Sequence, residues 1–205
     1  FNKSDSTKIT ESDYLYYGYA YLGNKDYDKA IDMFNKSLAE NKDNKADMND
    51  ALKNLASAYQ AKGDFTSAIP AYNKYLEGLE KMTAYDLGNL ASMYSDMSES
   101  ATGASKADAI KNADSVYADI SDKFPNVADF ATYQRARIAF AQDPEVKNGA
   151  AVSICQKLID LINAKQTKVD NDNTRLVTAY SYLGFYYFHI NNKAKAKENF
   201  AKVLE

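Results

Sequence analysis

One stretch decides how this chain folds: YLYYGYAYLGNKDYDKAIDMFNKS, residues 14–37. Apolar residues recur at spacings of three and four on both sides of a short polar turn, which predicts two amphipathic helices. Tyr21, which ends the first helix, lies nine residues before Ala30 of the second helix. Neither helix can bury its apolar stripe alone, so the stretch predicts a helical hairpin that packs on a neighbour.

The same hairpin recurs along the chain. Residues 52–75 and 180–203 are close copies, in which a tyrosine again lies nine residues before an alanine. Two weaker copies lie between them, at residues 87–125 and 135–161. The small residues of the first helices stand at 18, 56, 91, 136 and 184, with spacings of 38, 35, 45 and 48. A hairpin repeated at such a period is typical of a solenoid.

These copies resemble the tetratricopeptide repeat family, whose unit is a helix-turn-helix of about 34 residues. The resemblance covers nearly the whole chain and is most specific in the first, second and fifth copies. It implies an all-α fold, an α-α superhelix built as a right-handed solenoid of stacked antiparallel helical hairpins. We expect one domain of five hairpins, at residues 11–44, 49–82, 84–125, 129–165 and 174–205. The extra spacing after Tyr94 predicts a long connection at residues 95–106, and the excess spacing of the weaker copies in general predicts longer turns or longer second helices.

The two ends of the sequence indicate a fragment of a longer repeat array. Phe1-Asn2-Lys3-Ser4 repeats Phe34-Asn35-Lys36-Ser37 at a distance of 33 residues, which is close to one repeat. Residues 1–10 are therefore expected to be the tail of a preceding repeat, with a flexible arm as the alternative. No polar capping helix follows the fifth hairpin, although solenoids normally need one.

Small residues at matching places predict where the helices approach one another closely. A larger side chain there would force the two helices apart. The positions are Gly18, Ala56, Ala91, Ala136 and Gly184 in the first helices, and Ala30, Ala68, Ala109, Ala151 and Ala196 in the second helices.

The resemblance implies that the first helices line a concave wall, where residues pointing away from the packed stripe form the candidate ligand surface. This surface is aromatic at both ends and polar in the middle, which suits an extended peptide or a helix. Packing between repeats is the alternative role for each aromatic residue. The candidates are Tyr16, Tyr19, Lys53, Ser57, Asn89, Ser92, Tyr133, Arg137, Phe140, Tyr182, Phe185 and His189.

Family members that bind chaperone C-termini use a carboxylate clamp of lysine, asparagine and arginine on three successive first helices. One lysine and one amide are present here, but the second cation is missing. Two converging cations are needed to offset the desolvation of a carboxylate, so we expect no such clamp. The matching places hold Leu15, Tyr19, Lys53 or Ser57, Asn89, Phe130 and Gln134.

The sequence offers no catalytic or metal-binding set, so we predict a protein that is not an enzyme and needs no cofactor. His189 is the only histidine and Cys155 the only cysteine. We expect His189 to be a half-exposed packing residue and Cys155 to be buried. The run Asp170–Asn173 lacks the glycine and glutamate of a calcium loop, and predicts a polar linker with a helix N-cap at Asn173.

Charge and hydropathy restrict the partners. The 25 basic and 28 acidic residues are well mixed, so we expect no nucleic-acid partner. No run of about 18 or more apolar residues occurs, so we expect no transmembrane segment. The Phe124-Pro125 link is similar to repeat proteins of bacterial cell envelopes, which favours an envelope or periplasmic setting over the cytoplasm.

These observations predict a scaffold that binds a protein or peptide partner. The alternative is a self-associating structural array without a separate ligand, in which exposed terminal helices form a homo-oligomer. In that alternative, Phe200 and Val203 of the last helix would lie at the contact between chains.

Overall fold

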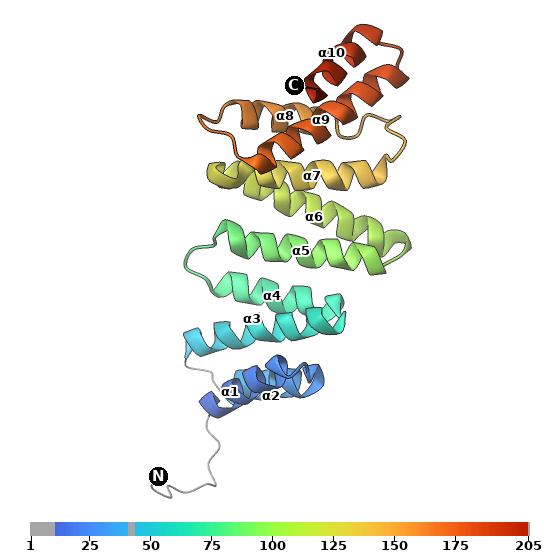
Figure 1. Ribbon diagram of the computed structural model, residues 1–205. Coiled ribbons are helices and arrows are strands. Elements are labelled where there is room, and N and C mark those ends of the chain that lie inside the picture. The colour runs from blue at the N-terminus through green and yellow to red at the C-terminus, as the bar shows by residue number, and fades with distance from the viewer. Residues whose placement is uncertain (1–10, 41–43, 205) are drawn as a thin grey trace, which may run out of the picture. The chain divides into compact units, whose positions relative to one another are not determined.

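The computed structural model describes residues 11–40 and 44–204, so the tail or arm expected at residues 1–10 lies outside the described residues. The described residues form α-helices with one short 3-10 helix and contain no β-strand, which confirms the predicted all-α fold (Figure 1). The odd-numbered helices are α1 (Glu11–Gly23), α3 (Lys45–Lys62), α5 (Ala84–Ser100), α7 (Ala128–Gln142) and α9 (Asp170–His189). The even-numbered helices are α2 (Tyr27–Glu40), α4 (Phe65–Gly78), α6 (Gly103–Lys123), α8 (Val152–Asn163) and α10 (Lys193–Val203), with the 3-10 helix η1 at Pro125–Val127.

The chain divides into two compact units, residues 1–109 and 110–205, and the division falls within α6. In the first unit α1 packs on α2 and α3 packs on α4, while α2 also contacts α3 and α4 contacts α5. In the second unit α7 packs on α8, α9 packs on α10, and α8 contacts α9. Each unit is therefore built by helices that pack on their neighbours in sequence.

The turn between α3 and α4 shows how local chemistry sets the helix ends. Gly63 ends α3 with a φ of 81°, a left-handed conformation that glycine adopts without strain. The side chain of Asp64 then accepts a hydrogen bond from the backbone N–H of Ser67 at 3.1 Å and caps α4. At the other end of α3, the Asn44 side chain caps the helix in the same way.

The long connection expected at residues 95–106 is wrong. Helix α5 continues to Ser100 and α6 begins at Gly103, so most of the extra residues lengthen the two helices. The serines remain compatible with a helix because their hydroxyls donate to backbone carbonyls, Ser95 to Ala91 at 2.9 Å and Ser98 to Ser95 at 2.7 Å.

The N-cap expected at Asn173 is also wrong, because α9 begins at Asp170. The carboxylate of Asp172 accepts a hydrogen bond from the backbone N–H of Val169 at 3.0 Å and so anchors the first turn. An acidic side chain in the first turn also interacts favourably with the helix dipole. The polar run is therefore the start of a helix, not a linker.

The small residues predicted at helix contacts are buried. The eight alanines among them are at most 4% exposed, and Gly18 and Gly184 are buried as well. A side chain at Gly18 would overlap the ring of Phe34, and a side chain at Gly184 would overlap the ring of Phe200. In both hairpins, an aromatic ring of the second helix therefore packs directly against the backbone of a glycine in the first helix.

We expect Gly18→Ala to destabilise the protein more than Gly184→Ala. The Phe34 ring is fully buried with the Tyr19 ring packed edge-on against it, whereas Phe200 is half-exposed and can move aside. Overpacking costs about 1–3 kcal/mol, against about 1 kcal/mol gained when alanine replaces a helical glycine. Chemical denaturation followed by circular dichroism measures both variants, and equal losses of stability would contradict this explanation.

We expect Ser37→Ala to raise the free energy of unfolding by about 1 kcal/mol. Ser37 of α2 is fully buried and its hydroxyl has no hydrogen-bond partner, so removing the oxygen removes a desolvation cost. Urea unfolding measures the change. Ser95→Ala is the control, because the Ser95 hydroxyl is hydrogen-bonded and its removal should bring no gain.

Candidate functional site

The predicted site residues of α1 lie together at the surface of the first unit. The rings of Tyr16 and Tyr19 contact edge to face, with centroids 6.2 Å apart. The Tyr19 hydroxyl donates a hydrogen bond to Asp50 Oδ2 of α3 at 2.9 Å, and its ring packs on Phe34. Tyr19 is therefore half-buried: it packs between α1, α2 and α3 and is still partly open to solvent. Tyr16, by contrast, is 68% exposed.

The predicted site residues of α3 and α5 are half-buried. Lys53 Nζ lies over the ring of Tyr75, 5.6 Å from its centroid, and the Ser57 hydroxyl donates to the Lys53 carbonyl at 3.0 Å. The Asn89 side chain donates to the Tyr72 hydroxyl at 3.2 Å. Ser92 lies one turn further along α5.

A buried carboxylate, Asp86, joins α4 to α5 beneath these residues. It accepts hydrogen bonds from the hydroxyls of Tyr75 at 3.1 Å and Thr83 at 2.6 Å. Burial alone would raise the pKa of Asp86, but these bonds and the nearby Lys53 charge lower it below its usual value. Burial and the hydrogen bond to Asp86 raise the pKa of Tyr75 to about 12. Asp86 is therefore charged and Tyr75 neutral at physiological pH.

In the second unit, Tyr133 of α7 makes a cation–π contact with Arg175 of α9. The guanidinium of Arg175 lies over the rings of Phe130 and Tyr133, at 5.8 and 5.7 Å from their centroids. Arg137 is exposed and donates to the Gln134 side chain at 3.0 Å. Of these α7 residues, Arg137 is the one whose charge faces solvent.

Tyr182 does not lie on an open surface, which corrects its assignment to the ligand face. It is 4% exposed, and its hydroxyl donates to Asp143 and accepts from the Ala151 N–H, both at 3.1 Å. Phe140 stacks on its ring with centroids 4.7 Å apart. Tyr182 and the half-buried Phe140 therefore connect α9 to the α7–α8 loop, which Asp143 orders by accepting three backbone N–H groups.

Three aromatic side chains mark the end of α9. Phe185 is 51% exposed and packs edge-on against Phe200 of α10, with centroids 5.1 Å apart. Phe188 is 62% exposed and contacts the ring of His189. His189 is exposed, so it is more open than the half-exposed packing residue expected from the sequence.

Exposed apolar side chains follow a simple pattern along the described helices. Large apolar residues are exposed on odd-numbered helices, and none lies within an even-numbered helix. Those on the odd-numbered helices are Tyr16, Tyr17, Tyr85, Phe130, Val177, Phe185 and Phe188.

A network of four charged side chains, which includes Arg175, links α7 to α9. Lys165 Nζ contacts Asp129 at 3.0 Å and Asp172 at 2.7 Å, and Arg175 also pairs with Asp129. Burial opposes the charge on Asp172, but hydrogen bonds from Lys165 and from the Val169 N–H lower its pKa. The two acids and two bases neutralise one another, which identifies this network as structural.

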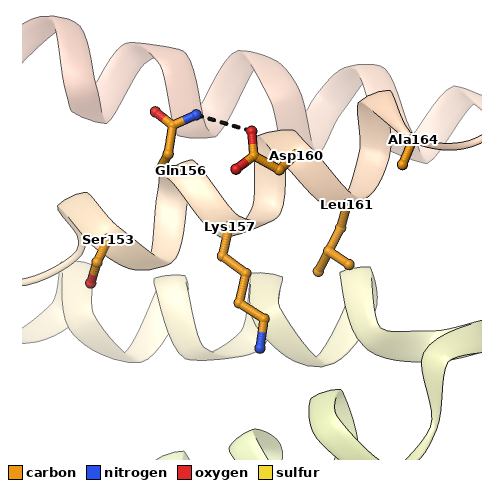
Figure 2. A pocket seen from close by; sticks show the side chains of 6 residues that line it. All are labelled: Ser153, Gln156, Lys157, Asp160, Leu161 and Ala164. Carbon is orange, nitrogen blue, oxygen red and sulfur yellow. Dashed lines mark hydrogen bonds between the residues drawn. The ribbon is translucent and has the colours of Figure 1, made fainter.

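A shallow hollow of about 560 Å³ lies along α8 (Figure 2). Figure 2 shows Lys157 and Leu161 on one side of the helix and Gln156 on the other, where its amide donates to Asp160 at 3.1 Å. Lys157 pairs with Asp122 of α6 at 3.1 Å. Gln156, Asp160 and Lys157 of this hollow are therefore engaged with one another or with α6.

The described residues offer no strong candidate for chemistry. Cys155 is fully buried, as predicted, and burial raises the pKa of its thiol to about 12. Within residues 11–40 and 44–204, no group of three histidine, cysteine or acidic side chains is placed to hold a metal ion. None of the helices described is long and apolar enough to cross a membrane.

Sequence reasoning missed several residues that shape this surface. Asp50 precedes Lys53 by three positions and Tyr85 precedes Asn89 by four, so each continues a helical stripe that contains a predicted residue. That spacing could have identified both. Arg175 had no such signal, because its partners Phe130 and Tyr133 lie on a different helix.

Comparison with known sequences identifies the repeat. Residues 11–81 match the sequence model of the tetratricopeptide repeat. The photosystem I assembly protein Ycf3 from two strains of Prochlorococcus marinus is 41% and 38% identical over 66 residues. These matches cover 31% of this chain, and the chain spans 38% of the length of each relative.

Solved structures extend the likeness to the whole chain. The C-terminal part of a tetratricopeptide repeat protein from Cytophaga hutchinsonii covers 100% of this chain, with 72% of its own length, a TM-score of 0.69 and 23% identity. A tetratricopeptide repeat protein from Parabacteroides merdae covers 95%, with 78% of its own length, a TM-score of 0.55 and 16% identity. Residues 11–81 therefore belong to the tetratricopeptide repeat family, and the chain as a whole has the fold of a tetratricopeptide repeat solenoid.

We expect Asp172→Asn to lower the stability of the protein at pH 7 by on the order of 2 kcal/mol, because a buried charged hydrogen bond is lost. The folded-state pKa of Asp172 lies below its usual value, so its contribution is present above about pH 4 and is lost as the pH falls through the folded pKa. The variant should therefore lose less stability than the wild type between pH 7 and acidic pH. Thermal melts across pH test this, with Asp119→Asn, an exposed partner of Lys123, as the neutral control.

Proposed function

We propose that this chain is a non-catalytic scaffold whose odd-numbered helices bind a protein or peptide partner. The proposal is carried by the confinement of exposed large apolar side chains within helices to the odd-numbered ones. Tyr85, at 70% exposed, and Tyr16, at 68%, are the most open of these residues in the first unit. Aromatic side chains that remain open to water on one set of helices are the usual anchors of protein interfaces.

The arrangement favours a bound segment over a small-molecule substrate. The open aromatic residues of the first unit are spread over α1 and α5, and those of the second unit over α7 and α9. Between them stand amides and hydroxyls such as Asn89 and Ser57, which can hydrogen-bond to a peptide backbone. Arg137 adds an exposed charge in the second unit.

The known relatives support the same class of function. The repeat that matches residues 11–81 is the tetratricopeptide repeat, whose stacked hairpins present extended binding surfaces. The Prochlorococcus relatives are named as assembly proteins, which is consistent with holding another protein. Self-association through Phe200 and Val203 stays a separate prediction.

We expect Tyr16→Ala or Phe188→Ala to weaken the binding of a peptide selected against the whole chain from a displayed random library. Loss of an exposed aromatic anchor costs about 1–2 kcal/mol, or roughly tenfold in Kd. Fluorescence anisotropy measures Kd, and circular dichroism confirms that the helices remain.

The control is Tyr27→Ala, because Tyr27 is a half-buried tyrosine of the same unit that lies on the even-numbered helix α2. Its replacement should leave Kd unchanged. The scaffold proposal fails if the library yields no binder, or if neither Tyr16→Ala nor Phe188→Ala weakens binding more than the control does.

A further inference from the structure

The first unit already holds a cation between an aromatic ring and a carboxylate. Lys53 Nζ lies 5.6 Å from the centroid of the Tyr75 ring, and the Tyr75 hydroxyl donates to Asp86 Oδ1 at 3.1 Å. Lys53 is also close enough to Asp86 for their charges to interact. The ring face and the carboxylate both attract the ammonium group, so this pair is filled by a side chain of the protein itself.

A second pair of the same kind lies beside it, and no cation of the described residues fills it. The Tyr19 hydroxyl donates to Asp50 Oδ2 at 2.9 Å, and the ring of Tyr16 flanks Tyr19. Asp50 and Lys53 are three residues apart on α3, so the two pairs are neighbours on one helix face. Among residues 11–40 and 44–204, no lysine or arginine forms an ion pair with Asp50 or lies over the ring of Tyr16 or Tyr19.

We propose that Tyr16, Tyr19 and Asp50 bind a lysine or arginine side chain of the partner peptide. This inference rests on the proposed function, because it names the chemistry of the segment that the odd-numbered helices hold. The open ring of Tyr16 supplies a π face, and the exposed Asp50 carboxylate supplies the opposite charge. Both groups are reached from solvent, so the incoming cation keeps part of its hydration and its desolvation cost is small.

The Asp50 carboxylate makes this position negative. Burial raises the pKa of the Tyr19 hydroxyl, and the charges of Asp50 and Asp47 raise it further. An acidic partner segment would meet repulsion here, whereas a basic segment would be attracted.

The test begins with a displayed random peptide library selected in parallel against the whole wild-type chain and against Asp50→Asn. We expect lysine and arginine to be enriched at one position of the wild-type binders and not among the Asp50→Asn binders. The asparagine can still accept the Tyr19 hydroxyl hydrogen bond, so the variant removes the charge and keeps the contact. Asp32→Asn is the matched control, because Asp32 is an exposed aspartate of the same unit on α2, paired with Lys36.

One synthetic wild-type binder is then made with lysine or with glutamine at the enriched position. We expect Asp50→Asn to weaken the lysine peptide by about fivefold, to leave the glutamine peptide unchanged, and Asp32→Asn to affect neither. Binders without basic enrichment, binders enriched in acidic residues, or equal losses for both peptides would overturn the cation assignment while leaving the scaffold proposal intact. A library without any binder would overturn both proposals.

Discussion

The structure depends on how closely the paired helices approach one another. At Gly18 and Gly184 the first helix has no side chain, and the ring of Phe34 or Phe200 from the second helix occupies that space. The alanines at the corresponding places of the other hairpins are buried in the same contacts. This close approach decides which side of each helix is buried. When the side with the small residues packs against the partner helix, the opposite side cannot take part in the same contact.

The exposure of the remaining aromatic residues follows from that constraint. Once the small and leucine-rich stripe of an odd-numbered helix is used for packing, its remaining aromatic residues, such as Tyr16 and Phe188, stay open to solvent. The even-numbered helices carry no large exposed apolar residue within their described lengths. This asymmetry between the two sets of helices is the observation on which the scaffold proposal rests.

The two units use aromatic rings and charges differently. In the second unit, Arg175 lies over two rings, while Lys165 and two aspartates complete a neutral network that holds α7 to α9. In the first unit, Lys53 fills one ring–carboxylate pair, and the neighbouring pair of Tyr19 and Asp50 has no cation from the described chain. The same chemistry is therefore structural in the second unit, and in the first unit we propose that it receives a cation of the partner.

The sequence by itself determined the hairpins, the small residues at their contacts and the burial of Cys155, because these follow from a period of three and four residues within a short stretch. It misplaced the start of α9, where the Asp172 carboxylate anchors the first turn. It also misplaced the α5–α6 connection, where Ser95 lies within a helix and donates its hydroxyl to the Ala91 carbonyl. Only the tertiary structure decided which aromatic residues are open and which charges pair. Tyr19 meets Asp50 across 31 positions and Tyr182 meets Asp143 across 39, so packing brings together partners that no local pattern connects.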